Sequence, residues 1–151
     1  MVTIYTDGSS RGNPGPGGCG TVMLYKGHRK ELSEGFRKTT NNRMELLAVI
    51  KGLEALTKEG VEVLVYSDSK YVVDAVEKGW LWGWVKKNFK AKQNRDLWER
   101  FIPAYQKHKV KFKWVKGHAG VPENERCDQL AVEAAGGAGL QVDSWYEQNV
   151  G

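Results

Sequence analysis

The chain of 151 residues has little cysteine and no long apolar segment. Its two cysteines, Cys19 and Cys127, are too far apart for a zinc-ligand spacing and too few for a disulfide framework. We expect both thiols to be reduced and buried, with a bridge between them as the alternative. No apolar run approaches the roughly 20 residues of a membrane span, and the N-terminus lacks a basic stretch followed by an apolar region. Secreted and membrane proteins are therefore excluded as first interpretations, and the length favours one domain.

Acidic residues are absent from residues 78–95, although the whole chain contains 23 basic and 18 acidic residues and has a net charge of +5. This stretch alone carries +6, which leaves −1 for the rest of the chain. It also contains Trp80, Trp82 and Trp84, half of the six tryptophans. Lysines that neutralise phosphates and flat rings that lie along sugars or bases are typical of a nucleic-acid-binding surface. The alternative is a solvated helix whose tryptophans point into the core.

The order of the apolar patterns predicts one mixed α/β domain. Alternating residues predict three strands, at residues 2–6, 22–25 and 32–36, with a turn-rich loop over residues 11–18. The later patterns predict, in order, a helix over 44–56, a strand over 61–66, helices over 70–76, 80–87 and 96–108, a strand over 109–116 and a helix over 124–135. Such an order predicts one mixed sheet with helices on its faces.

The strand predicted over 109–116 alternates between apolar and basic residues. We expect Val110, Phe112 and Trp114 on its buried face and three lysines on the other face, where their charge serves solubility. The glycine-containing segment 137–151 is expected to be a loosely attached tail. Residues 1–136 then form the domain, with a basic protrusion at about residues 78–95.

Four acids lie at positions that a role in solubility does not explain. Asp7 and Asp68 each close a strongly apolar strand, so their carboxylates lie together if these strands are neighbours. Glu45 falls in the first turn of a helix whose apolar stripe must face the same sheet, and Asp128 lies at the border of the buried face of the last helix. Taken singly, each has an ordinary interpretation as a turn residue, a charge near a helix end, an N-cap or a surface acid.

Together, four such carboxylates would repel one another unless they were protonated or paired with a cation. Oxygen ligands of this kind suit Mg²⁺ or Mn²⁺ rather than Zn²⁺. Two such ions, about 3.5 to 4 Å apart, can activate a water and stabilise the leaving oxygen in phosphodiester cleavage. With the basic, tryptophan-rich stretch, the acids therefore predict a metal-dependent nuclease.

Five separated motifs in this sequence resemble those of type 1 ribonuclease H, in particular the bacterial enzymes with a basic protrusion. The motifs are Thr6-Asp7-Gly8-Ser9, Gly12-Asn13-Pro14-Gly15-Pro16-Gly17-Gly18, Thr40-Asn41-Asn42-Arg43-Met44-Glu45, Ser67-Asp68-Ser69, and Val115-Lys116-Gly117-His118-Ala119-Gly120 continuing through Asn124-Glu125-Arg126-Cys127-Asp128. The resemblance covers about residues 2–136. It implies the ribonuclease H-like fold, a five-stranded mixed sheet in which an antiparallel meander of three strands is followed by parallel strands, flanked by helices. It also implies Mg²⁺-dependent hydrolysis of the RNA strand of RNA/DNA hybrids, leaving 5′-phosphate and 3′-hydroxyl ends.

The resemblance also assigns roles to single residues. Asp7, Glu45, Asp68 and Asp128 match the four metal-ligating carboxylates, and His118 matches a histidine that helps proton transfer or product departure. A neutral imidazole that titrates near pH 6.5 suits that task, and a loop histidine without a task is the alternative. The acids that match no catalytic position are expected to be surface or capping residues: Asp74, Asp96, Glu125 and Asp143.

The resemblance further predicts the contacts to the hybrid. Asn13, Asn41 and Asn42 match positions in the minor groove, where only the 2′-hydroxyl distinguishes RNA from DNA. Residues of a phosphate pocket and of the protrusion would hold the DNA strand: Lys38, Thr40, Asn94, Trp80, Trp84, Lys86 and Lys87. This sequence departs from the family where Lys38 replaces a frequent arginine, where Lys70 replaces a frequent glutamine, and in the length of the protrusion.

Two other functions are compatible with the fold. A non-catalytic hybrid-binding module would require the loss of a carboxylate, and all four are present. A nuclease acting on DNA would not require the three asparagines or the basic stretch. The resemblance favours a monomer in the cytoplasm that uses Mg²⁺, with Mn²⁺ as a possible substitute, and that needs neither an obligate protein partner nor a membrane.

Overall fold

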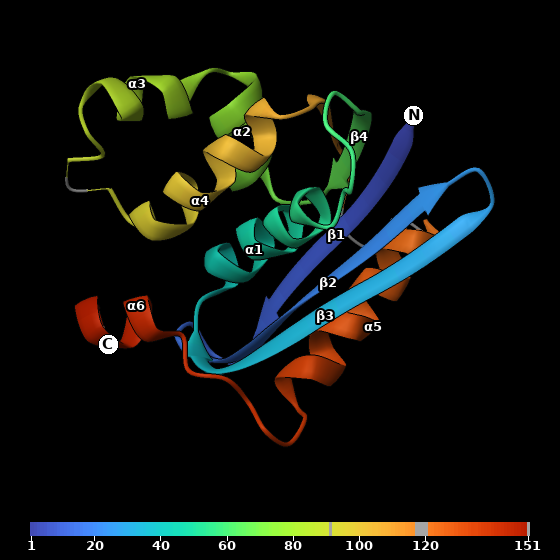
Figure 1. Ribbon diagram of the computed structural model, residues 1–151. Helices are drawn as coiled ribbons and strands as arrows, with labels where there is room; N and C mark the ends of the chain where they lie inside the picture. Colours follow the sequence, from blue (N-terminus) through green and yellow to red (C-terminus); the bar gives the residue numbers. More distant parts are fainter. Residues whose placement is uncertain (91, 117–120, 151) are drawn as a thin grey trace.

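The computed structural model describes residues 1–90, 92–116 and 121–150, and a five-stranded sheet with helices on both faces forms its centre (Figure 1). The elements are β1 (Val2–Ser10), β2 (Gly15–Tyr25), β3 (His28–Thr39), α1 (Asn41–Glu54), β4 (Glu62–Ser67), α2 (Lys70–Glu77), α3 (Trp80–Lys86), α4 (Arg95–Gln106), β5 (Lys109–Trp114), α5 (Pro122–Ala135) and α6 (Ser144–Asn149). The strand order is β3-β2-β1-β4-β5, antiparallel from β1 to β3 and parallel from β1 through β4 to β5. The predicted five-stranded mixed sheet is confirmed.

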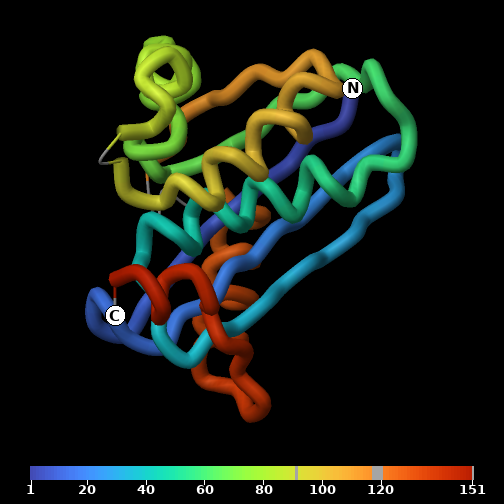
Figure 2. Tube along the Cα trace, turned by 60° about the vertical axis from the view of Figure 1, so that its left-hand side comes forward, coloured from blue at the N-terminus to red at the C-terminus, as the bar shows by residue number. Residues whose placement is uncertain are grey.

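The helices form one layer on each side of the sheet. Helix α1 packs on β1 and β2 and is covered on its other side by α4, whereas α5 packs on β1, β2 and β3 from the opposite side (Figure 2). Because α1 is enclosed on both sides, every residue from Arg43 to Ile50 is buried. Both cysteines are unpaired and buried, as expected, and burial raises the pKa of Cys19 to about 12. None of the described helices combines the length and the apolar character needed to cross a membrane.

Strands β1 and β2 are longer than the sequence predicts. Strand β1 continues to Ser10, and β2 begins at Gly15 inside the segment that was expected to be a loop. The glycines of β2 make room for a helix rather than for turns, because a Cβ at Gly20 would lie 2.3 Å from the carbonyl oxygen of Cys127 in α5. Because β1 continues to Ser10, the expected end of this strand at Asp7-Gly8 was wrong, and Asp7 lies inside the strand.

The segment after residue 136 is attached more firmly than its glycine content predicts. Gln141 pairs with the edge strand β3: its N–H donates to the Gly35 carbonyl, and its own carbonyl accepts from the Arg37 N–H, each at 2.9 Å. Further along, Asp143 and Tyr146 are buried. These contacts contradict the expectation of a loose tail, and they bring the C-terminal segment against the start of α1.

The exposed side of β5 also differs from expectation. Phe112 is buried and Val110 is half-buried, but the Trp114 side chain is 42% exposed. The Nζ atom of Lys70 lies 4.7 Å from the centre of the Trp114 ring. Trp114 is therefore part of the surface beside α2.

Candidate active site

The sheet register brings Asp7 and Asp68 together. Strands β1 and β4 are parallel neighbours in which Tyr5 pairs with Tyr66, and each aspartate follows two residues later in its own segment. Because side chains alternate along a strand, both acids lie on the sheet face that carries these tyrosines. The indole N–H of Trp114 donates to the backbone carbonyl of Asp68 at 3.1 Å, which holds the chain where it leaves β4.

Gly8 positions Glu45 beside Asp7. The Gly8 N–H donates to Asp7 Oδ1 at 2.9 Å and also to Glu45 Oε1. A Cβ at Gly8 would lie 2.3 Å from the Glu45 nitrogen and 2.4 Å from the Met44 carbonyl carbon. Only a residue without a side chain therefore lets α1 approach β1 this closely at Met44 and Glu45.

Asp128 reaches the same place from the other side of the sheet. Helix α5 crosses β2 at Gly20, which pairs with Asp7 across the antiparallel ladder. Asp128 then follows Cys127 and reaches the cavity that the other acids line. This cavity has a volume of about 420 Å³. Its lining residues are Asp7, Gly8, Ser9, Asn41, Asn42, Glu45, Asp68, Ser69, Lys70, Tyr71 and Asp128.

The acids form a site suited to a metal ion. Oxygen atoms of Asp7, Glu45 and Asp68 all lie within 4.8 Å of one another. Burial raises the pKa of Asp7 to about 7, and the charges of Asp68 and Asp128 act in the same direction. Burial also raises the pKa of Glu45 well above its usual value, reinforced by Asp7 and Asp68. Charged carboxylates are thus unfavourable here without a cation, and oxygen-only ligands suit Mg²⁺ or Mn²⁺.

The asparagines predicted to read the hybrid border this cavity. Asn41 and Asn42 line it and are exposed at the start of α1. Asn13 lies beside them, because its Oδ1 accepts from the Asn41 N–H at 3.0 Å. Thr40 is the N-cap of α1, and its hydroxyl accepts from the Arg43 N–H at 3.3 Å. The structure therefore gathers these four residues at one helix start.

Two residues predicted for the phosphate pocket, Lys38 and Asn94, differ in how deeply they are buried. Lys38 is half-buried near the end of β3. Asn94 is only 6% exposed, its amide nitrogen donates to the Tyr71 hydroxyl at 3.0 Å, and its Oδ1 accepts from Arg43 at 3.4 Å. The Asn94 side chain is thus engaged inside the protein at the start of α4.

The structure divides the basic stretch between the surface and the core. Trp80 is 51% exposed, with the Lys78 ammonium 5.3 Å from its ring centre. Trp84 is half-buried and packs edge-on against Trp98 with ring centres 5.6 Å apart. Lys86 and Lys87 are exposed, like Trp80. The surface of the protrusion is therefore basic, whereas Trp84 also contributes to the core.

A buried arginine was missed by the sequence analysis. Arg43 is 2% exposed and donates to both carboxylate oxygens of Asp96 at 2.7 and 2.8 Å and to both of Asp143 at 2.7 and 2.8 Å. Burial lowers the pKa of Arg43, but these hydrogen bonds outweigh it and raise the pKa. The expectation of a surface acid was wrong for Asp143, which is buried. Asp143 does occupy the N-cap position of α6, but its side chain makes no capping hydrogen bond there. Its partner lies 100 residues away in the sequence, so no local pattern could have indicated the pair.

Another predicted residue, His118, lies outside the described residues.

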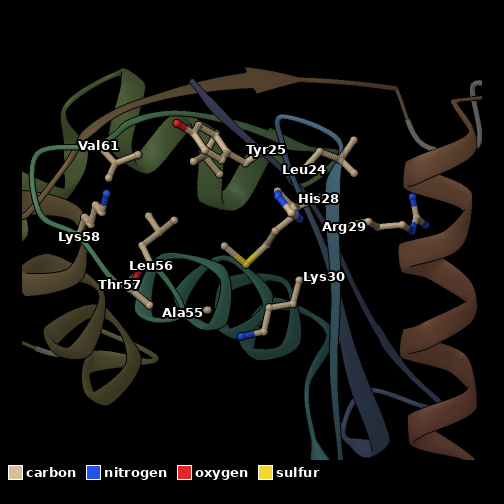
Figure 3. Close-up of a pocket in the computed structure, with 12 residues that line it drawn as sticks. Leu24, Tyr25, His28, Arg29, Lys30, Ala55, Leu56, Thr57, Lys58 and Val61 are labelled. Carbon is tan, nitrogen blue, oxygen red and sulfur yellow. The ribbon is translucent and has the colours of Figure 1, made fainter.

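A second cavity, of about 330 Å³, lies between the β2–β3 hairpin and the C-terminal end of α1, lined by Tyr25, Leu56 and Val61 among others (Figure 3). No acid lines it among the described residues, so it lacks the ligands of a hard metal ion. The carboxylate cavity is the candidate active site.

Comparisons with known proteins agree with this geometry. The model of the family described as RNase H matches residues 1–136. The chain is similar to the ribonuclease H of Desulforamulus reducens, with 63% identity over 147 residues, 94% of this chain and 92% of that protein. It is also similar to the ribonuclease H of Syntrophus aciditrophicus, with 57% identity over 151 residues, 97% of this chain and 87% of that protein.

Solved structures give the same result. LC9-RNase H1, described as a type 1 RNase H with the type 2 active-site motif, superposes with a TM-score of 0.81 at 36% identity and covers 97% of this chain and 79% of its own. LC11-RNase H1, solved in complex with an RNA/DNA hybrid, superposes with a TM-score of 0.65 at 28% identity and covers 90% of this chain and 97% of its own.

Proposed function

Because the chain belongs to the ribonuclease H family, we propose that it hydrolyses the RNA strand of RNA/DNA hybrids at the carboxylate cavity, with two metal ions and with 5′-phosphate and 3′-hydroxyl products. One observation carries the proposal: oxygen atoms of Asp7, Glu45 and Asp68 converge within 4.8 Å in a cavity that Asp128 also lines. The hybrid bound to LC11-RNase H1 supports the choice of substrate.

Asp7, Glu45, Asp68 and Asp128 would hold Mg²⁺, with Mn²⁺ as a substitute. Two such ions, when bound, activate a water and stabilise the leaving oxygen. The chain's own contribution is to fix the acids: the Gly8 N–H donates to both Asp7 and Glu45. For His118 we keep the proposed role in proton transfer or product departure.

Asn13, Asn41 and Asn42 would read the 2′-hydroxyls and base edges of the minor groove, since they border the cavity and carry both donors and acceptors. We propose that the DNA strand is contacted mainly by three exposed side chains of the protrusion: Trp80, Lys86 and Lys87. Thr40, Lys38, Trp84 and Asn94 complete the proposed DNA contacts. Because the Asn94 side chain is engaged with Tyr71 and Arg43, its main role is to position the start of α4.

The test uses one end-labelled RNA as a single strand, as an RNA duplex and as an RNA/DNA hybrid, together with a labelled DNA duplex of the same sequence, each with Mg²⁺ or EDTA. We expect cleavage of the hybrid only, in Mg²⁺ only, and none with Asp68→Asn. Asp74→Asn is the matched control, because this aspartate lies on α2 and pairs with the exposed Lys78 at 3.6 Å. Hybrid that is bound but never cut would contradict the proposal and support a binding module; cleavage of DNA duplexes would support the DNA nuclease.

We also propose that the chain acts as a monomer in the cytoplasm, as the resemblance implies. Light scattering after size exclusion should give a mass near 17.0 kDa. A dimer mass at micromolar concentration would contradict the monomer.

A further inference from the structure

The sheet face that carries Asp7 and Asp68 continues into a row of lysines on β5. Tyr5 of β1 pairs with Tyr66 of β4, which pairs with Lys113 of β5, so these three residues form the row directly before the two aspartates. The row before that one consists of Thr3, Leu64 and Lys111. Since alternate residues of a strand are about 6.6 Å apart, Lys113 lies one such step from the carboxylate row and Lys111 lies two steps away.

None of the described helices covers this part of the sheet. Helix α5 packs on β1, β2 and β3, and Figure 1 shows it beside β2 and β3, away from β4. Lys109, Lys111 and Lys113 are exposed, and within residues 1–90, 92–116 and 121–150 none of them forms an ion pair. We call these three residues the β5 lysine face. No ion pair within the described chain therefore engages its charge.

The two stacked tyrosines restrict Lys113. The rings of Tyr5 and Tyr66 are parallel within 8° with centres 4.9 Å apart. The Lys113 ammonium lies 5.9 Å from the centre of the Tyr66 ring. A lysine held against a ring loses less conformational entropy when it binds an anion, which favours binding. Both faces of Tyr66 are occupied, so the surface offers charge rather than a free ring for a base.

We propose that the β5 lysine face binds the phosphates of a single-stranded RNA extension that leaves the carboxylate cavity. The inference rests on the proposed function, because it needs an RNA strand in that cavity. Phosphates match the charge of the lysines, and the face is continuous with the row of Asp7 and Asp68. The solubility role expected from the sequence is the competing interpretation.

The width of the face selects a single strand. Among the described residues, only β4 and β5 lie between α5 and the free edge of the sheet. These two strands are spaced about 4.8 Å apart, so the open strip is about 10 Å wide. A duplex is wider than this strip and, lying flat on it, would meet α5. A single RNA strand fits between them.

Lys111 and Lys113 are expected to contribute more than Lys109. Lys109 pairs in register with Glu62, whose carboxylate lies on the same face. Lys111 and Lys113 pair instead with the uncharged Leu64 and Tyr66. The test therefore changes these two lysines.

The experiment measures binding of a blunt hybrid and of the same hybrid with a single-stranded RNA extension at the 5′ or the 3′ end. Binding is followed by fluorescence anisotropy in Mg²⁺ at several salt concentrations, in an Asp68→Asn background that we expect not to cleave. The variants are Lys111→Gln/Lys113→Gln and the matched control Lys26→Gln/Lys58→Gln. The control removes the same charge from exposed lysines at the opposite end of the sheet.

Each single-strand phosphate contact adds about 0.7 to the slope of log affinity against log salt, so two contacts add about 1.4. We expect one extension to bind more tightly than the blunt hybrid and with this steeper slope, in the parent and in the control. Lys111→Gln/Lys113→Gln should lose both gains and bind the blunt hybrid unchanged. Equal affinity for all substrates in the parent, or an unchanged gain in the double variant, would overturn the inference. Cleavage of the blunt hybrid by the wild-type chain reports separately on the proposed function.

Discussion

Replacing Asp7 by asparagine should stabilise the metal-free protein, and the gain should increase with pH. The pKa of this carboxyl is raised from 3.8 to about 7, by burial first and then by the charges of Asp68 and Asp128. A folded-state pKa above the unfolded one means that the folded state binds more protons. The contribution of the Asp7 carboxyl to the free energy of unfolding is therefore fully present below pH 4 and is lost as the pH rises from there through 7.

The magnitude follows from the shift. Each pKa unit corresponds to about 1.4 kcal/mol, so a rise of about 3 units destabilises the charged, folded state by about 4 kcal/mol. Between pH 5 and pH 8 about 3 kcal/mol of this penalty develops, because over this range the carboxyl is ionised in the unfolded state while the folded state keeps its proton until near pH 7. For a domain of this size, 3 kcal/mol corresponds to about 6–12 °C in Tm. Asparagine fills similar space without the charge and avoids the penalty.

Urea unfolding of the wild type and Asp7→Asn, in EDTA at pH 5 and pH 8, measures this difference. We expect the variant to be more stable at pH 8 and the difference to shrink at pH 5. Asp74→Asn is the control for losing a carboxylate elsewhere and should show no such gain. Mg²⁺ should stabilise the wild type more than Asp7→Asn. If Asp7→Asn is no more stable than the wild type at pH 8, the cavity is not a cluster of mutually repelling, buried carboxylates.

Two further predictions concern the residues that hold the site. Gly8→Ala should lower the free energy of unfolding by about 1–3 kcal/mol and weaken Mg²⁺ binding, because the added Cβ would lie 2.3 Å from the backbone of Glu45. Calorimetric titration measures the Mg²⁺ binding. The control Gly83→Ala, whose Cβ would enter open space, should leave Mg²⁺ binding unchanged. Asp143→Asn should lower the free energy of unfolding by about 1.5–3 kcal/mol, since a buried hydrogen bond to the charged Arg43 is lost. Glu147→Gln on the same C-terminal segment, whose partner Arg37 is exposed, should change it less, and equal losses would contradict the buried network.

The strands of the sheet could be predicted from local patterns, but the residues at which they begin and end could not. Alternation of Val2, Ile4 and Thr6 indicates β1 correctly, since all three are buried. The glycines of β2 misled the prediction, because a glycine needed for a turn and a glycine under a helix look alike in sequence. Only the position of α5 against Gly20 distinguishes them.

The acids of the site were accessible to sequence reasoning because Asp7 and Asp68 directly follow apolar strand patterns, and because helix periods place Glu45 and Asp128 beside the same sheet. The neighbours that hold them were not. Gly8 was recognised as part of a motif but not as the donor to Glu45, and the partners of Arg43 come from segments 53 and 100 residues away. Such contacts depend on the packing of the whole chain rather than on any local pattern.

The separation of charge explains how an acidic cavity can accept an anionic strand. Four carboxylates at the end of the sheet would repel phosphates, and two divalent ions would offset that charge. The basic protrusion, which carries +6, lies outside the cavity in and around α3. The exposed lysines of β5 begin one row before Asp7 and Asp68 on the same face. In the proposed mode of binding, the lysines would attract the nucleic acid without neutralising the acids. The acids remain available to hold metal, because no lysine or arginine of the described chain forms an ion pair with them.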